Sequence, residues 1–307
     1  MSFRMRFVLC ALSAVCLVVV SDSGRAQDGA SDSFTYSDET PFRFRKTLFS
    51  WNHEPRNGEE EPEENDRLVT DRPHFSEASS LVGLGRVQIE TGYTRIGLRD
   101  GNQALIGHSF PETLFRIGML AEWFELRIGY NYGVEEFLDP IGMRSRNSGS
   151  QDLYVAAKLA LAEQRGVLPE MAIFPQLRVP TGSRVFTDNQ PLPGFLLAYS
   201  WKLADWLELE CNTQLNRRRD DADHFYTEFI QTVNVEYDLT EHLGAYTEWF
   251  CFVPSGAVSA NALPQHYFNG GFQIYFSNNV QLDLRAGVGL NDHSDRYFAG
   301  VGLSVRL

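Results

Sequence analysis

Strict alternation of apolar and polar side chains over stretches of about ten residues is the feature that most constrains this chain. From Phe124 to Gly133, aromatic and aliphatic residues occupy every second position, and Glu, Arg, Asn and Gly occupy the positions between them. The same division recurs in 207–216 and 280–291, and in most of the closing residues. A period of two residues predicts β-strands that each carry one apolar and one polar face.

The length of these stretches separates two architectures. Strands of soluble proteins typically have about 5 to 6 residues, whereas a strand tilted across a bilayer needs about 9 to 11. The pattern therefore favours an all-β fold, an antiparallel transmembrane β-barrel with lipid outside and a polar lumen inside, whose closed wall leaves no unpaired strand edge. The alternative is a soluble β-sandwich or propeller, whose strands also alternate.

Alternation and turn residues together predict about twelve strands, an even number that brings both ends of the barrel to the same side of the membrane. Pro175, inside the fifth strand, fits least well because it has no N–H to donate to a neighbouring strand. The predicted strands are 84–97, 110–120, 123–134, 151–162, 170–180, 194–203, 206–217, 225–237, 243–253, 265–277, 280–291 and 295–307.

The connections between these strands are of two kinds. Short polar turns recur at 121–126, 204–209, 239–243 and 277–282, and we expect them to be tight periplasmic turns in which Trp123 and Trp206 are interfacial aromatics. Longer stretches rich in Pro, Asn, Gly and Ser predict extracellular loops at 135–149, 181–193 and 254–264.

The residues before the barrel predict export. Arg4 and Arg6 precede an apolar run from Phe7 to Val20, which is shorter than the roughly 20 residues that a membrane-spanning helix needs, and small residues follow it. The expected organisation is a signal peptide at 1–26, a disordered acidic periplasmic segment at 27–68 and an outer-membrane barrel at 69–307. The alternative for the first segment is an uncleaved anchor; for the second it is a partial plug of the barrel.

Charge and cysteine content exclude other classes. The formal net charge is -13 and there is no basic tract, which argues against a nucleic-acid partner. Of the four cysteines, Cys211 and Cys251 lie beyond the predicted signal peptide. Two cysteines do not form a disulfide framework, and although they could pair, we expect both to be apolar residues of the wall.

The stretch Thr70-Asp71-Arg72-Pro73-His74-Phe75-Ser76-Glu77, followed by Gly85-Arg86-Val87-Gln88-Ile89-Glu90-Thr91-Gly92-Tyr93, resembles the opening of the family named for the MetA pathway of phenol degradation. The resemblance covers about residues 68–307. It implies an outer-membrane protein of the transporter kind, with outer-membrane lipid and the outer-membrane assembly machinery as partners and a small molecule as solute. The last residue is Leu307, a departure from the Phe or Trp with which many such barrels end.

If the polar faces point inward, acidic and basic side chains share the lumen. They can form ion pairs that fill the barrel and keep it rigid, or a polar path in which opposed charges orient a solute. The candidate lumen-lining residues are Glu90, Glu112, Arg116, Glu125, Arg127, Lys158, Arg178, Lys202, Glu208, Glu210, Glu228, Glu236, Glu248, Asp283, Arg285 and Arg306.

The first functional expectation is a passive transporter or narrow channel for small molecules, aromatic or hydrophobic ones among them, the solute class being implied by the family resemblance alone. The alternatives are a non-conducting envelope scaffold and, on the hint of His266 alone, an outer-membrane hydrolase. We expect no enzyme activity, because no convincing serine accompanies His266. The histidines are dispersed along the chain with no pair at metal-ligand spacing, so no metal site and no cofactor are predicted.

Overall fold

The computed structural model describes residues 47–49, 67–100, 103–138 and 143–307, all within one compact unit that spans 41–307. The predicted signal peptide and nearly all of the predicted acidic segment lie outside the described residues. Within the described residues, no helix is long and apolar enough to cross a membrane.

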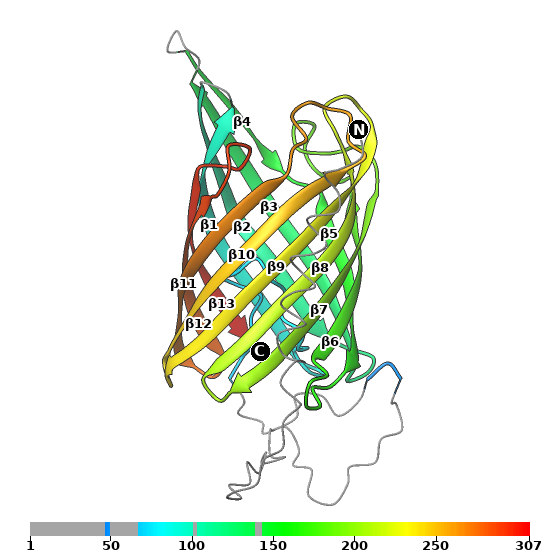
Figure 1. Ribbon diagram of the computed structural model, residues 1–307, viewed down its shortest axis with the longest axis vertical. Helices are drawn as coiled ribbons and strands as arrows, with labels where there is room; N and C mark the ends of the chain where they lie inside the picture. The colour runs from blue at the N-terminus through cyan, green and yellow to red at the C-terminus, as the bar shows by residue number, and fades with distance from the viewer. Residues whose placement is uncertain (1–46, 50–66, 101–102, 139–142) are drawn as a thin grey trace, which may run out of the picture. The chain divides into compact units, whose positions relative to one another are not determined.

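The described chain consists of antiparallel strands joined by turns and loops (Figure 1). Their bounds are β1 Val87–Asp100, β2 Gln103–Gly118, β3 Phe124–Leu138, β4 Arg144–Ser150, β5 Leu153–Ala162, β6 Glu170–Val179, β7 Leu192–Ala204, β8 Leu207–Arg219, β9 Phe225–Thr240, β10 Leu243–Ser255, β11 Gln265–Ser277, β12 Val280–Gly289 and β13 Tyr297–Arg306.

These strands close into one barrel. Apart from β4, neighbouring strands pair in sequence order, with β5 on β3, and β1 pairs with β13, so the wall closes into a ring. β4 and β5 both pair with β3 and take one place in the wall, which makes a closed barrel of twelve positions. The predicted all-β barrel of about twelve strands is confirmed.

One predicted loop is wrong. Most of 135–149 belongs to the end of β3 and to β4, which pair from Tyr132–Ser150 to Leu138–Arg144. β4 pairs only with β3, and the two strands rise beyond the rest of the wall (Figure 1). Sequence patterning missed β4 because a strand without a second neighbour, built from Arg, Ser, Asn and Gly, has no apolar face.

Two further local irregularities separate the observed strands from the predicted ones. β2 begins at Gln103, ahead of the predicted start at 110, and a shift in strand register at 109–112 interrupts its alternation. Pro175 does lie within β6, where the ladder to β5 is interrupted between the Ala156–Gln176 and Leu159–Ile173 pairs. A missing N–H is tolerated there because no β5 partner needs it.

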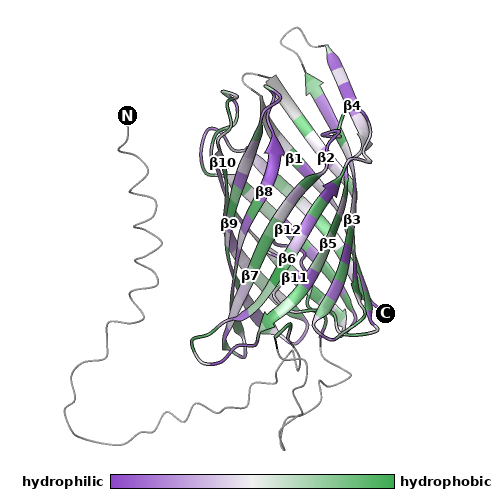
Figure 2. Cartoon of the chain, turned by 90° about the vertical axis from the view of Figure 1, so that its right-hand side faces the viewer, coloured by the Kyte–Doolittle hydropathy of each residue, from purple (hydrophilic) through white to green (hydrophobic). Residues whose placement is uncertain are grey.

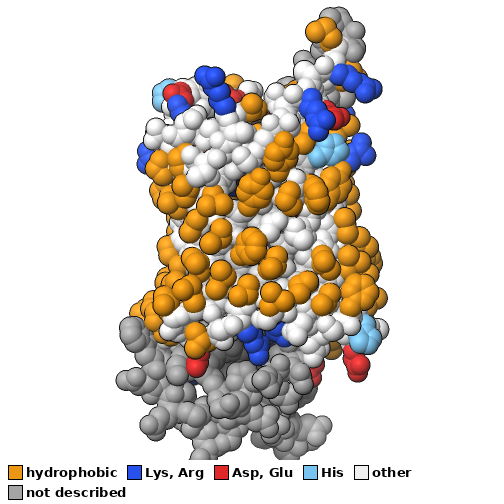
Figure 3. All heavy atoms as spheres, turned by 180° about the vertical axis from the view of Figure 1, so that it is seen from behind, with side chains coloured by type: hydrophobic (Ala, Val, Ile, Leu, Met, Phe, Trp, Pro, Cys, Tyr) orange, Lys and Arg blue, Asp and Glu red, His pale blue; other side chains and the backbone are white. Residues whose placement is uncertain are grey.

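The two faces of the wall differ as alternation predicts. Exposed apolar side chains of the strands, such as Phe115, Phe195, Phe272 and Val301, point outward. Hydrophobic side chains cover the middle of the face drawn in Figure 3, whereas charged side chains gather toward its ends. Figure 2 shows the same interleaving of hydrophobic and hydrophilic residues along single strands. The largest buried side chains include Arg116, Arg127 and Lys158, so the interior is polar.

The segment 67–86 does not continue the wall. It enters and leaves at the end of the barrel where the short turns lie, since Leu68 N donates to Asn278 O at 2.8 Å and Gly85 N donates to Gly118 O at 2.8 Å. Between these points it contacts strands all round the ring, from β1 and β3 to β8, β10 and β12. A segment that touches every side of a closed barrel lies inside it, and we call residues 68–82 the luminal plug.

Candidate functional site: a plugged lumen

The first half of the plug is anchored by a buried cluster of acids and arginines. Asp71 forms ion pairs with Arg127 at 2.7 Å and with Arg116 at 3.4 Å. Arg127 also forms an ion pair with Glu77. Glu125 of β3 lies between the two arginines, at 2.9 Å from Arg116 and 3.1 Å from Arg127. Buried charges are tolerated only when they are paired in this way, so removing one partner leaves an uncompensated charge.

Arg72, the next residue of the plug, is anchored on β2 and β12. Its guanidinium lies 3.2 Å from Asp283 of β12 and 2.7 Å from Glu112 of β2, which Arg285 also approaches at 3.0 Å. A side chain added at Gly92 or Gly302 would collide with this guanidinium. The glycines of β1 and β13 thus provide the room that Arg72 fills.

Backbone amides of the plug are satisfied by side chains of the wall. Glu248 of β10 accepts from Phe75 N and Ser76 N, both at 2.7 Å, and Glu90 of β1 accepts from Asp71 N and Arg72 N at 3.0 and 3.1 Å. Val82 N donates to Glu125 at 2.9 Å. The plug has no secondary structure of its own, so these carboxylates replace the missing backbone partners.

Aromatic side chains gather around Phe75 at the deep end of the plug. Phe75 stacks on Phe250 with ring centroids 4.6 Å apart, and Phe250 stacks in turn on Tyr267 at 4.9 Å. Phe252 and Phe298 approach the same rings from β10 and β13. These five residues form the aromatic patch, an apolar area of the lumen.

A cavity of about 840 Å³ opens below the plug, at the end of the barrel with the short turns. Plug residues line its inner side, and the turns line its mouth. Its charged lining includes Arg67, Lys202, Glu208, Glu236 and Arg306. We call this cavity the vestibule.

The structure places most of the predicted lumen-lining residues against the plug. Residues that hydrogen-bond to the plug or form an ion pair with it are Glu90, Glu112, Arg116, Glu125, Arg127, Lys158, Glu210, Glu236, Glu248, Asp283 and Arg285. Lys202, Glu208 and Arg306 line the vestibule. Glu228 lies toward the end of the barrel opposite the vestibule and forms an ion pair with Arg218 at 2.7 Å. Arg178, an exposed residue of β6, interacts electrostatically with both Arg218 and Glu228.

Sequence reasoning missed the partners of these wall residues. The opening stretch Thr70–Glu77 served only as a family signature, yet its Asp71, Arg72 and His74 are all buried. An alternating pattern identifies strands and cannot locate an irregular segment. The only sequence signal for the plug was a run of mixed charged and polar residues immediately before the first strand.

Three other residues considered from the sequence are His266, Cys211 and Cys251. The ring of His266 stacks on Trp249. The nearby Ser294 hydroxyl donates to the backbone carbonyl of His266 at 2.8 Å and not to its ring. Cys211 and Cys251 are both buried and unbonded to each other.

Comparison with solved structures shows the fold. An outer membrane channel from Pseudomonas putida F1 matches with a TM-score of 0.58 at 11% identity, over 81% of this chain and 100% of that one. Weaker similarities, with TM-scores of 0.43 and 0.46, extend to the NanC porin (10% identity, 72% of this chain, 100% of that chain) and to the transport unit of the autotransporter AIDA-I from Escherichia coli (11% identity, 72% and 88%).

Among curated proteins, none matches this chain. The family model described as "Putative MetA-pathway of phenol degradation" matches residues 70–307, from the start of the plug motif to the last residue of the chain. The match therefore takes in residues 70–82 of the plug and the complete wall. The chain belongs to this family.

Proposed function

We propose that this protein is a passive outer-membrane channel for small molecules, in which the luminal plug controls passage. The observation that carries the proposal is the closed barrel with an apolar outer face and a polar lumen, occupied by a separate chain segment. Side chains of the wall alone do not fill the lumen. The channel fold shared with the Pseudomonas putida protein supports the same conclusion.

The location follows from the same surface. Outward apolar side chains on long strands match the lipid-facing band of an outer-membrane barrel. We place the short turns and the vestibule on the periplasmic side, and we propose export by the signal peptide at 1–26 followed by insertion through the outer-membrane assembly machinery. The segment at 27–68 then precedes the plug on the periplasmic side.

Charges in the lumen can fill the barrel with ion pairs or form a polar path for a solute, and the plug allows both. Its ion pairs hold it against the wall, as in a filled barrel, yet each pair joins the wall to a loop that both enters and leaves at the turn end. Such a loop can move as a unit without opening the wall. The conducting state is then one in which the plug has shifted toward the vestibule.

The aromatic patch supports a solute class. A small molecule that passes the plug from the loop end meets Phe75, Phe252 and Phe298 on its way, and stacked rings favour flat, apolar solutes. We therefore propose small aromatic or hydrophobic compounds as solutes. This is consistent with the name of the family.

The test is conductance of the refolded barrel with the plug locked or free. Ser76 Oγ lies 2.7 Å from Thr232 Oγ1 of β9, which is compatible with a disulfide in the double variant Ser76→Cys/Thr232→Cys. We expect ion flux through the wild type in planar bilayers, much lower flux through the oxidised double variant, and recovery after reduction with dithiothreitol.

The single variant Ser76→Cys is the matched control and should conduct equally with and without reductant. Equal flux through the oxidised and reduced double variant would show that solutes pass without movement of the plug. A folded barrel that conducts in none of these states would overturn the channel and favour the scaffold.

A further inference from the structure

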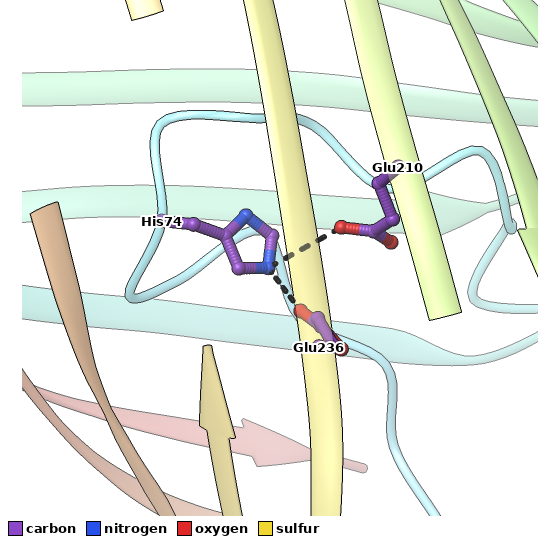
Figure 4. A group of neighbouring side chains, drawn as sticks. All are labelled: His74, Glu210 and Glu236. Atoms are coloured by element: carbon purple, nitrogen blue, oxygen red, sulfur yellow. Dashed lines mark ion pairs between the residues drawn. The ribbon is translucent and has the colours of Figure 1, made fainter. Parts of the chain in front are cut away.

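A histidine of the plug faces two carboxylates of the wall. His74 is 4% exposed, and its Nε2 lies 2.6 Å from Glu236 Oε1 and 3.6 Å from Glu210 Oε2. Figure 4 shows the ring of His74, on the irregular plug, pointing toward side chains from the neighbouring strands β8 and β9. Sequence spacing could not bring these three residues together.

The orientation of the ring is set by its other nitrogen. His74 Nδ1 lies 2.6 Å from the carbonyl oxygen of Ser76. A carbonyl only accepts hydrogen bonds, so Nδ1 carries the proton and Nε2 is the atom directed at the carboxylates. Histidine ligands of metal ions are held in the same way, with the second nitrogen donating to a backbone carbonyl or a carboxylate.

Nε2 lies within ion-pair distance of Glu236 Oε1, at 2.6 Å. Nε2 is buried, and no residue that the structure describes accepts a hydrogen bond from it. A buried polar nitrogen without a hydrogen-bond partner is unfavourable. A cation between the three side chains would use the lone pair of Nε2 instead.

Three glutamates lie together on β8 and β9, with Lys202 of β7 across from one of them, Glu208. The described ion pairs of Arg72, Arg116 and Arg127 are made with other acids. On β8 and β9, Glu208 lies directly across from Glu236, and like charges in such cross-strand pairs are unfavourable. Asn234 donates to Glu210 at 3.0 Å and orients it toward His74.

We propose that His74, Glu210 and Glu236 form a binding site for a divalent transition-metal ion of the zinc class. The three ligand atoms all lie within 4.8 Å of one another. An imidazole nitrogen with two carboxylate oxygens suits zinc, whereas calcium and magnesium prefer ligands that are all oxygen. Glu236 also lines the vestibule, which provides an entry path and space for a water molecule as fourth ligand.

The site has a structural consequence. One ligand belongs to the plug and two belong to the wall, so a bound ion fastens the plug to β8 and β9. The proposal does not depend on the channel function, because a plug can be fastened in a barrel that conducts nothing.

Zinc binding to the refolded full chain tests the site. The experiment titrates zinc chloride into the wild type and the variants His74→Gln and Glu236→Gln, and measures the metal retained per folded barrel after gel filtration. The control is His242→Gln, which removes a histidine of the vestibule mouth that is not one of the three ligands. A heat-dependent shift in gel mobility reports that each barrel is folded.

We expect one zinc ion per wild-type and control barrel, with affinity at least about tenfold weaker in both ligand variants, since even indirect supports of a metal contribute that much. Equal zinc binding by His74→Gln would overturn the proposal. So would a wild type without zinc, which would leave His74 as an imidazolium paired with the two carboxylates.

X-ray absorption of the zinc-loaded wild type gives an answer even if the variants fail to fold. The expected spectrum has one histidine nitrogen and otherwise oxygen ligands. Sulfur ligation, or two or more imidazoles, would place the zinc elsewhere and overturn the site.

Discussion

Arg72 of the plug and Asp283 of β12 form a buried ion pair across the inside of the barrel, with Nε 3.2 Å from Oδ2 and the Asp283 side chain 0% exposed. They are 211 positions apart in the chain. Glu112 receives the same guanidinium at 2.7 Å. One side chain of the plug thereby ties it to both β2 and β12, close to the β1–β13 closure of the wall.

Loss of Arg72 should loosen the plug. In Arg72→Ala, Asp283 keeps no ion pair among the described residues and Glu112 keeps only Arg285. Breaking a buried pair from one side typically costs about 3–5 kcal/mol. We expect a lower midpoint in the heat-dependent gel shift and larger single-channel conductance. Arg165→Ala, at a guanidinium that is 68% exposed, should change neither; a wild-type midpoint in Arg72→Ala would show that the pair contributes nothing.

A methyl group at Gly302 should disturb the same contact from the wall. The added carbon would meet Arg72 Nε and Asp283 Oδ2, and the paired guanidinium has to move. Overpacking of this kind costs about 1–3 kcal/mol. We expect Gly302→Ala to lower the gel-shift midpoint, whereas Ala299→Val, which enlarges an exposed residue of the same strand, should leave it unchanged. An equal loss in both variants would assign the effect to the strand and not to Arg72.

Glu125 should be the most sensitive acid of the lumen. It accepts from Arg116, Arg127 and the amide of Val82, and its side chain is 0% exposed. Replacement by Gln keeps its size but leaves two buried arginines with one carboxylate fewer, which is strongly unfavourable. We expect Glu125→Gln to fold in lower yield and to unfold at lower urea concentration than Asp205→Asn, whose carboxylate is 99% exposed. Equal urea midpoints would contradict this.

Asp220 should hold two loops together at the end of the barrel opposite the vestibule. Its carboxylate accepts from His224 N and Ala222 N in its own loop and from Val258 N and Ser259 N of the next loop, all within 3.0 Å. These backbone hydrogen bonds, with that of His224 first, lower the pKa of Asp220 to about 2. Because the folded pKa lies below the ordinary value of 3.8, this contribution is complete above that value and is lost as the pH falls through about 2.

Digestion with pepsin checks this behaviour. The loop 256–264 of the wild type should resist cleavage near pH 4 and lose its resistance near pH 2. Asp220→Ala should be cleaved readily at both values, and Asp205→Ala should follow the wild type. A loop cleaved equally fast in wild type and Asp220→Ala at pH 4 would show that Asp220 does not restrain it.

Much of the wall could be predicted from sequence because its determinants are local. A strand between lipid and a polar lumen must alternate at period two wherever it runs, so Phe124–Gly133 or 280–291 reveals its structure without reference to any other strand. The short turns at 205–206, 241–242 and 278–279 were visible for the same reason. The even count of twelve positions follows from these local signals. β4 was not predicted because it pairs with β3 alone and has no apolar face.

The plug and its partners could not be found in this way. The residues of Thr70–Glu77 have no repeating pattern, and their partners lie on strands from one end of the chain to the other. Closure of β1 on β13 decides that Arg72 meets Asp283 and that His74 meets Glu210 and Glu236. The sequence alone therefore determined the strands of the wall other than β4, their two faces and the short turns, since each depends on near neighbours in the chain. Only the tertiary structure decided what occupies the lumen, because that depends on which distant side chains the closed barrel brings together.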